Sequence, residues 1–345
     1  MLKNKVLGCI VGGAVGDALG YPIEFRSYRE IASHFGKSGV VEYVYDKGLI
    51  SDDTQMVLFT IDGLLKDEDY KGKHRDKKVR DIYQSYLDWY VTQNYPFSGR
   101  FHSNRWCENS KLLNTPDLFD LRAPGNTCLS ALGSGRMGTV EKPINNSKGC
   151  GGVMRVAPIG LYFKPENHDI GYVAKIGGDV SAITHGHQLG YLPSAVLACM
   201  INKIVFYNTP IRDAIVESVT IVDKMYNHPS EMGVLRELLN NAFKLAENNK
   251  DDYKNIDKLC GNKFNGGGWV AEETLAISVY CVLKYENDFK KAVVASVNHS
   301  GDSDSTGAVT GNIMGAILGY DKIPKMYIED LEMKDLIEEM ALRLI

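Results

Sequence analysis

The chain has 345 residues, 44% of them apolar and 24% charged, and its 43 acidic residues exceed its 39 basic residues to give a formal net charge of −4. A chain of this length buries enough apolar surface to form a core without disulfides or a structural metal. Nucleic acid is not an expected partner, because binding to phosphate backbones requires a strongly basic face.

Apolar residues recur at helical spacing along most of the chain, and strand-like alternation is confined to one short run, Gly39–Tyr45. In chain order, helices are predicted over residues 3–18, 53–67, 78–92, 127–137, 169–184, 189–206, 211–226, 232–248, 271–285, 288–297 and 304–318. No flexible linker and no repeat of fixed period divides the chain. The sequence therefore predicts an all-α protein with one compact multi-helix domain over residues 1–345.

The first predicted helix carries glycines spaced by four, which places them on one face where another backbone can approach closely. These are Gly8, Gly12, Gly16 and Gly20. Three further groups are Gly149, Gly151 and Gly152; Gly266, Gly267 and Gly268; and Gly301, Gly307 and Gly311. We interpret these three groups as glycine-rich loops that line a pocket.

The seven cysteines are odd in number, irregularly spaced and without a CxxC pair, a pattern typical of reduced thiols. The apolar run that follows Lys3 and Lys5 is interrupted by Asp17, and we expect it to be too short for a signal peptide or a membrane-spanning helix. A cytoplasmic protein without membrane attachment is the prediction. The oligomeric state is not predicted by the sequence.

Two acidic segments, Ser51–Met56 and His299–Gly307, each open an apolar predicted helix. Helix capping is one interpretation, since Asp52 with Gln55 three residues later matches a capping box. Together, however, the segments hold four carboxylates and several hydroxyls, more than two caps require. Such oxygen groups are ligands for Mg²⁺, Mn²⁺ or Ca²⁺ and not for zinc.

The second segment also partly matches two known motifs. An EF-hand loop beginning at Asp302 would need a bidentate Glu at its twelfth position, where the chain has Ile313. A phosphatase of the haloacid dehalogenase type would place Asp302 at the end of a buried strand, whereas a predicted helix precedes it. Neither motif is therefore favoured.

Several motifs occur in the order seen in ADP-ribosylglycohydrolases. They are Gly16–Gly20, Glu24, Ser51–Thr54, Gly149–Arg155, Thr184–His185, Gly267–Glu273 and Gly301–Thr306. The chain resembles this family from about residue 5 to residue 320. The resemblance implies an all-helical fold with a central dimetal cleft, which holds two divalent cations, Mg²⁺ or Mn²⁺.

The resemblance also implies roles for individual acidic residues. The metal-binding positions correspond to Ser51, Asp52 and Asp53 on one side of the cleft and to Asp302, Asp304 and Ser305 on the other. Ser305 stands where the family has a metal-binding Thr, and it keeps the hydroxyl oxygen. Glu24 matches the acidic residue that faces the reacting sugar.

Physical chemistry is consistent with these roles. Carboxylates at helix N-termini are expected to stay ionised because of the local backbone dipole. The cations could bind the vicinal hydroxyls of a ribose, and a carboxylate would activate water or protonate the leaving group at the anomeric carbon. Asp53 and Glu24 are the two candidates for that catalytic carboxylate, and the sequence leaves both open.

The substrate is expected to contact two loops that resemble the family's phosphate and ribose loops, within Arg122–Thr127 and Ser147–Gly152. The predicted substrate-binding residues are Gly125, Asn126, Thr127, Ser147, Gly149, Cys150, Gly151, Gly152, Met154, His185 and Trp269. For the first loop the alternative is a Pro-Gly turn with a Thr cap, and for His185 and Trp269 it is ordinary core packing. Cys150 has no identifiable partner base and is not predicted to be a nucleophile.

The resemblance implies a metal-dependent hydrolase that acts on an ADP-ribosylated protein and releases ADP-ribose. The forms of the Ser51–Thr54 and Gly301–Thr306 motifs look closer to arginine-directed members than to serine-directed ones, which favours an N-glycosidic bond to arginine. Alternatives are an O-linked serine substrate, a small ADP-ribose-like or nucleoside substrate, and a non-catalytic ADP-ribose binder. The target protein is not predicted by the sequence.

Overall fold

The computed structural model of the protein describes residues 1–66, 75–97, 110–248, 251–261 and 266–345. Its α-helices are α1 (Leu2–Gly20), α2 (Tyr28–Phe35), α3 (Asp52–Leu65), α4 (Arg75–Asn94), α5 (Asn126–Gly133), α6 (Ala157–Tyr162), α7 (Ile170–Ala182), α8 (Gln188–Phe206), α9 (Ile211–Tyr226), α10 (Pro229–Ala246), α11 (Asp252–Ile256), α12 (Ala271–Lys284), α13 (Phe289–Val297), α14 (Ser303–Leu318), α15 (Lys325–Glu329) and α16 (Lys334–Leu342). Within these residues the extended pairings are two isolated bridges, Gly48 with Leu331 and Gly149 with Val270. The all-α prediction is confirmed, and the domain limits of 1–345 stay a prediction.

Each predicted helix overlaps an observed one, although residue 67, at the end of a predicted helix, lies outside the described residues. The helices that were not predicted are α2, α6, α11, α15 and α16, which are all nine residues or shorter. α2 does have a start signal in the sequence, because Ser27 and Glu30 form a reciprocal capping box. Periodicity alone is a weak signal over so few turns.

The strand-like run Gly39–Tyr45 does not form a strand. The backbone N–H of Val40 donates to Asn298 Oδ1 at 2.7 Å, and Asn298 Nδ2 donates to the Val40 carbonyl at 2.8 Å. A side chain thus satisfies the peptide groups that a neighbouring strand would otherwise pair. The strand-like alternation of this run therefore does not correspond to a strand, in agreement with the all-α prediction.

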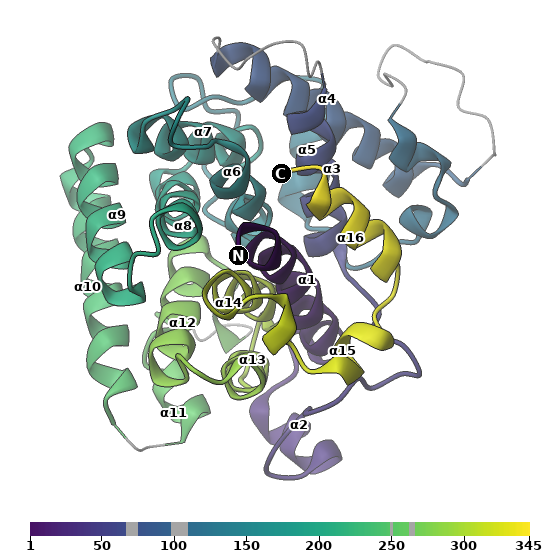
Figure 1. The fold of residues 1–345 in the computed structure, drawn as a ribbon, viewed down its shortest axis with the longest axis vertical. Coiled ribbons are helices and arrows are strands. Elements are labelled where there is room, and N and C mark those ends of the chain that lie inside the picture. The colour runs from purple at the N-terminus through teal and green to yellow at the C-terminus, as the bar shows by residue number, and fades with distance from the viewer. Residues whose placement is uncertain (67–74, 98–109, 249–250, 262–265) are drawn as a thin grey trace.

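The predicted glycine face of α1 packs against α14, and the two helices lie side by side at the centre of the molecule (Figure 1). Each of the four glycines of this face meets a backbone group of α14, in the pairs Gly8 with Gly315, Gly12 with Gly311, Gly16 with Gly307, and Gly20 with Ser303. Gly307 and Gly311 therefore lie inside a helix, and their assignment to a pocket-lining loop is wrong. Their role is to let two backbones approach closely.

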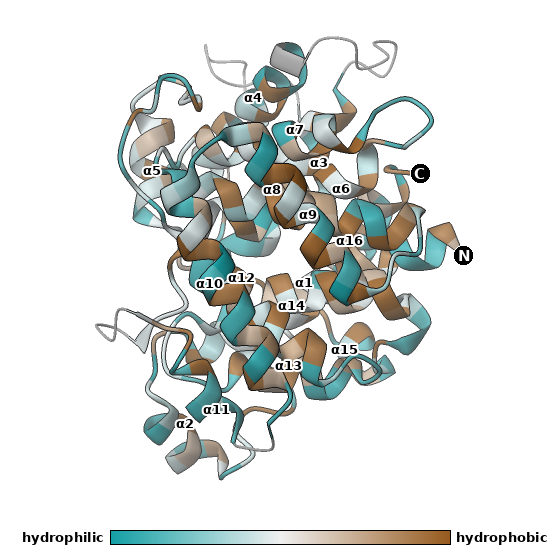
Figure 2. Ribbon diagram, turned by 90° about the vertical axis from the view of Figure 1, so that its left-hand side faces the viewer, coloured by the Kyte–Doolittle hydropathy of each residue, from teal (hydrophilic) through white to brown (hydrophobic). Residues whose placement is uncertain are grey.

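α1 and α8 lie in the interior of the protein. The span Leu2–Ile23 and α8 are both long and apolar enough to cross a membrane by length and composition, which corrects the expectation that the first run is too short. The most apolar 18-residue stretch is 83% buried inside the protein in Leu2–Ile23 and 89% buried in α8, as is usual for core helices of globular proteins. Figure 2 shows the difference between a buried and a peripheral helix: α8 is coloured mostly as hydrophobic, whereas much of the peripheral α10 is coloured as hydrophilic.

Candidate active site

A cavity of about 600 Å³ lies between the N-termini of α3 and α14, and loops from distant parts of the chain complete its walls. The predicted site residues that line it are Glu24, Asp52, Asp53, Gly125, Asn126, Thr127, Ser147, Gly149, Cys150, Gly151, Met154, His185, Trp269, Asp302, Asp304 and Ser305. Its volume falls in the range of about 300–1,000 Å³ that is usual for small-molecule sites. The fold thus brings two acidic segments about 250 residues apart into one cavity.

Two predicted site residues, Ser51 and Gly152, are not on the cavity wall. Ser51 is the N-cap of α3, and its hydroxyl accepts the backbone N–H of Asp53 at 3.2 Å. Gly152 packs on the side chain of Ser181, which leaves no room for a Cβ atom. We therefore assign both residues to the support of the wall.

The alternative interpretation of Asp52 and Gln55 as a capping box is wrong, because Ser51 is the N-cap of α3. Asp52 is the first residue of α3, and its carboxylate accepts the backbone N–H of Gly125 at 3.0 Å. Gln55 Oε1 instead accepts hydrogen bonds from Trp89 and Gln93 on α4. In contrast, Asp302 is a true N-cap of α14, because its Oδ1 accepts the Ser305 N–H at 3.1 Å.

Asp17 on α1 organises the start of α3, a role that the sequence analysis missed. Its buried carboxylate accepts the backbone N–H groups of Ser51 and Thr54 at 3.0–3.1 Å, and also the Thr54 hydroxyl. A carboxylate on the central helix α1 thus binds the N-terminus of α3, where the helix dipole favours negative charge. The available signal was the single acidic residue inside an otherwise apolar helix.

The acidic side chains are close together and incompletely hydrogen-bonded. One carboxylate oxygen from each of Glu24, Asp302 and Asp304 lies within 4.8 Å of the others. On the facing wall, Asp53 Oδ1 accepts the Ser305 hydroxyl at 3.3 Å. Asp53 Oδ2 is buried and has no hydrogen-bond partner among the described residues. A buried, unpartnered carboxylate oxygen is costly unless something compensates its charge.

The crowded carboxylates resist ionisation. Burial, followed by repulsion from neighbouring carboxylates, raises the pKa of Glu24 to about 9. Burial also raises the pKa of Asp52 to about 8 and the pKa values of Asp53 and Asp304 well above the usual range. For Asp52, Asp53 and Asp304, burial and mutual repulsion therefore outweigh the helix dipole when no cation is bound, so the dipole alone does not keep these three groups ionised.

These properties fit a site for divalent cations. Carboxylate and hydroxyl oxygens are the ligands preferred by Mg²⁺ and Mn²⁺, and a bound cation would offset the repulsion between the acidic groups. The unpartnered Asp53 Oδ2 provides a free ligand atom in the interior of the cavity wall. The residues that fit this role are Asp52, Asp53, Asp302, Asp304 and Ser305, with Glu24 beside them.

A glycine-rich turn holds Asp302 from behind the cavity. Gly266, Gly267 and Gly268 have φ values of 87°, 88° and 75°, a left-handed backbone that favours glycine. The Gly267 carbonyl accepts the Asp302 N–H at 3.1 Å. None of the three glycines is on the cavity wall, so their predicted place in the pocket lining is wrong.

The loop around Cys150 joins the segment that carries Trp269. The backbone N–H of Cys150 donates to the Trp269 carbonyl at 2.9 Å, next to the isolated bridge between Gly149 and Val270. The Cys150 thiol donates to Asp302 Oδ2 at 3.0 Å, and burial together with that carboxylate raises the pKa of the thiol well above its usual range. Cys150 is therefore a neutral donor to the acidic cluster, in agreement with the prediction that it is not a nucleophile.

Phe25, which was not predicted, and Ala123, which lies within the predicted loop Arg122–Thr127 but was not singled out, also line the cavity. Both are non-glycine residues with a left-handed backbone, with φ values of 55° and 53°. Phe25 follows Glu24 directly, its side chain is 48% exposed, and its N–H donates to the Gly301 carbonyl at 2.7 Å. Strained backbone of this kind is found often at functional sites and gives no signal in the sequence.

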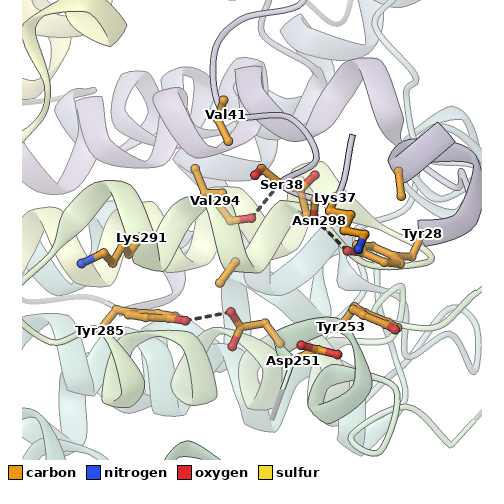
Figure 3. Close-up of a pocket in the computed structure, with 13 residues that line it drawn as sticks. Tyr28, Lys37, Ser38, Val41, Asp251, Tyr253, Tyr285, Lys291, Val294 and Asn298 are labelled. Atoms are coloured by element: carbon orange, nitrogen blue, oxygen red, sulfur yellow. Dashed lines mark hydrogen bonds between the residues drawn. The ribbon is translucent and has the colours of Figure 1, made fainter. Parts of the chain in front are cut away.

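A second cavity, of about 690 Å³, lies between α2, α11 and α13 (Figure 3). The rings of Tyr28 and Tyr253 stack at its edge with a centroid distance of 3.8 Å. Its acidic groups are already compensated, since Asp252 accepts hydrogen bonds from Tyr285 and Lys284, and Asp251 pairs with Lys254. The uncompensated acidic groups are in the other cavity, which we therefore take as the candidate active site.

The chain is similar to known proteins over most of its length. The chain is 24% identical to the ADP-ribosyl-(dinitrogen reductase) glycohydrolase of Rhodospirillum rubrum, over 96% of this chain and 92% of that protein. It is also 24% identical to the ADP-ribosylarginine hydrolase Tri1 of Serratia proteamaculans, over 98% of this chain and 78% of that protein. A solved structure described as an ADP-ribosylglycohydrolase-related protein complex shares the fold, with a TM-score of 0.67, 22% identity, and coverage of 99% of this chain and 97% of that one. A sequence model described as ADP-ribosylglycohydrolase matches residues 1–345, and the chain therefore belongs to the ADP-ribosylglycohydrolase family, a family of ADP-ribosyl hydrolases.

Proposed function

We propose that the protein is a divalent-cation-dependent hydrolase that removes ADP-ribose from modified arginine side chains of proteins. The observation that carries the proposal is the cluster of buried carboxylates with an unpartnered Asp53 Oδ2, in a cavity of about 600 Å³. Such a cluster is unfavourable in the cation-free protein, and its oxygen ligands suit Mg²⁺ or Mn²⁺.

In this proposal two cations are held by Asp52 and Asp53 from α3 and by Asp302, Asp304 and Ser305 from α14. When bound, the cations would supply Lewis acidity and an anchor for vicinal ribose hydroxyls. Asp17 orients the ligands on α3 through its hydrogen bonds to Ser51 and Thr54. Asp302 has two supports, the Gly267 carbonyl at its N–H and the Cys150 thiol at its Oδ2.

Glu24 is the proposed group for proton transfer. It is half-buried beside Asp302 and Asp304, whereas Asp53 is buried and has a free oxygen suited to a cation. Cleavage of the glycosidic bond requires that water be deprotonated as it attacks the anomeric carbon and that the leaving nitrogen be protonated. A carboxyl with a raised pKa is protonated at neutral pH, so it can protonate the leaving nitrogen, and the carboxylate left behind can then take the proton from the attacking water.

The nucleotide part of the substrate is proposed to lie against the two loops Arg122–Thr127 and Ser147–Gly152, which contribute residues to the cavity wall. Thr127, at the start of α5, and Ser147, just before Gly149, bring their hydroxyl oxygens to within 3.1 Å of each other on this wall. Hydroxyls, exposed N–H groups and a helix start are suitable donors for a pyrophosphate. Trp269 adds an indole N–H that is buried without a partner among the described residues.

The choice of arginine is supported by the relative named ADP-ribosylarginine hydrolase Tri1. The experiment is to incubate the protein with Mg²⁺ or Mn²⁺ and two substrates, one ADP-ribosylated on arginine and one on serine, and to measure free ADP-ribose. Release from the arginine substrate alone is expected. Release from serine alone would overturn the linkage, and binding of ADP-ribose without any release would overturn the hydrolase itself.

A further inference from the structure

Arg155 is a buried cation without a carboxylate partner among the described residues. It ends the 3₁₀ helix Cys150–Arg155 behind the cavity floor and is fully buried. Its guanidinium lies 4.2 Å from the ring centroid of Tyr86, and Nη1 donates to two sulfur atoms, Met56 Sδ at 3.4 Å and Cys128 Sγ at 3.6 Å. Burial of an uncompensated charge costs several kcal/mol, so a structural or functional use is expected.

The shortest hydrogen bond of Arg155 leads toward the cavity. Arg155 Nη2 donates to Thr184 Oγ1 at 2.6 Å, and Thr184 Oγ1 lies 2.8 Å from His185 Nδ1. A guanidinium can only donate, so the threonine oxygen accepts from it and keeps one hydrogen of its own. Thr184 can donate that hydrogen to His185 Nδ1. The ring proton of His185 is then on Nε2.

His185 is at the same time a wall residue of the cavity and 1% exposed. Burial, and secondly the charge of Arg155, lower the pKa of His185 to about 3, so the imidazole is neutral at physiological pH. A neutral ring with its proton on Nε2 is a hydrogen-bond donor at that atom and neither a base nor a cation ligand there.

The space beside His185 Nε2 is kept open by a glycine. A Cβ atom on Gly149 would lie 3.2 Å from His185 Nε2 and 3.6 Å from Ser147 Oγ. Two polar groups therefore converge on the space next to this glycine. A ligand oxygen there could accept a hydrogen bond from both of them.

We propose that Arg155 and Thr184 are positioning residues that hold His185 as the neutral Nε2–H tautomer, which donates a hydrogen bond to an acceptor oxygen of bound ADP-ribose. The identity of the ligand rests on the proposed function, whereas the tautomer does not. Arg155 acts through Thr184 and does not touch the ligand. A buried charge behind the floor thereby sets the direction of one hydrogen bond inside the cavity.

The test compares Thr184→Val, which removes the hydroxyl at similar size, with Thr184→Ser, which keeps it. Nitrogen-15 NMR of histidine-labelled protein reports the tautomer, and His185→Gln identifies the resonance. Wild type and Thr184→Ser are expected to have the proton on Nε2, and Thr184→Val to populate the Nδ1–H form. A wild-type ring protonated on Nδ1, or a tautomer unchanged in Thr184→Val, would overturn the proposal.

Binding of free ADP-ribose is the second readout, measured by calorimetry with Mg²⁺ present. Thr184→Val is expected to weaken binding about tenfold and Thr184→Ser less than twofold, since one hydrogen bond is lost in the first case only. Turnover at saturating substrate should change less than KM. Equal affinity of the two variants would overturn the role of His185 as a donor to the ligand.

Arg155→Lys and Arg155→Met complete the set, with circular dichroism to establish folding. Arg155→Lys keeps a donor and is expected to retain the wild-type tautomer, whereas Arg155→Met is expected to lose it. If Arg155→Met does not fold, the Thr184 pair still decides the matter. A protein that binds no ADP-ribose would overturn the proposed function and the ligand half of this inference, while the NMR result on the ligand-free protein still decides the positioning half.

Discussion

Gly16 and Gly307 pack backbone against backbone where α1 meets α14. A Cβ atom on Gly16 would lie 2.0 Å from the Gly307 carbonyl oxygen, and one on Gly307 would lie 2.3 Å from the Gly16 carbonyl oxygen. Asp17 follows directly on one helix and Asp304 lies three residues earlier on the other. The spacing of these two helices therefore sets the relative position of the two acidic walls of the cavity.

Gly16→Ala is expected to lower the free energy of unfolding by about 3 kcal/mol, because backbone atoms cannot move aside as a flexible side chain could. Urea denaturation followed by circular dichroism measures the change. The matched control is Gly233→Ala within α10, where a Cβ atom meets nothing within 4 Å. This control should stabilise the protein by about 0.5–1 kcal/mol, since alanine is the better helix former. Similar effects of the two substitutions would contradict the packing argument.

Asp17→Asn is expected to weaken Mn²⁺ binding about 10- to 100-fold, because residues that orient metal ligands commonly have effects of that size. The amide keeps one acceptor oxygen but loses the charge and the second oxygen that hold Ser51 and Thr54. Calorimetric titration with Mn²⁺ measures the affinity. Asp335→Asn, at a side chain that is fully exposed, is the control. An Asp17→Asn protein with wild-type affinity would show that α3 is oriented without this carboxylate.

Asp304→Asn should separate stability from activity. Asparagine can still accept the Ser305 N–H that Asp304 Oδ1 accepts at 3.0 Å, while one charge leaves the crowded cluster. We expect the cation-free variant to be at least as stable as wild type, and the gain in melting temperature on addition of Mn²⁺ to disappear together with ADP-ribose release. Thermal unfolding with and without Mn²⁺ provides the comparison. Normal release by this variant would refute the assignment of Asp304 to the cation site.

The raised pKa of Glu24 predicts a pH-dependent difference between wild type and Glu24→Gln. In the unfolded chain Glu24 ionises near pH 4.5, whereas in the folded cation-free protein its pKa is about 9. Between these values the folded state binds the extra proton, so Glu24 lowers the stability of wild type as pH rises through this window, and the neutral Gln variant lacks this contribution. The variant should therefore gain stability relative to wild type from pH 5 to pH 9, without divalent cations. A difference that does not vary with pH would contradict the burial of this carboxyl in an acidic cluster.

The helices were predictable where the apolar pattern was long, as in α8 and α14. The short helices α15 and α16 were missed because each spans too few turns for periodicity to register. The glycine spacing of α1 predicted a close helix contact, but the partner helix could not be inferred, since the two elements are nearly 300 residues apart in the chain.

For the candidate site, the resemblance in motif order allowed most of the residues that line the cavity to be named from the sequence. The place of Ser51 behind the wall and the contribution of Asp17 depend on three-dimensional hydrogen bonding that no spacing rule contains. The raised pKa values of Asp52 and Asp304 were likewise not predictable from the spacing of residues in the sequence. Each acidic motif alone favours ionisation at a helix N-terminus, and only their assembly in one buried cavity reverses that preference.

The most direct test of the account is the dependence of ADP-ribose release on divalent cations. Protein freed of metal by a chelator, and then dialysed, is assayed on arginine-ADP-ribosylated protein at increasing Mn²⁺ or Mg²⁺ concentration. The account predicts release at the background rate without cation, recovery on addition of cation, and no recovery in Asp304→Asn. Full release by metal-free wild-type protein, or no release at any cation concentration, would contradict it.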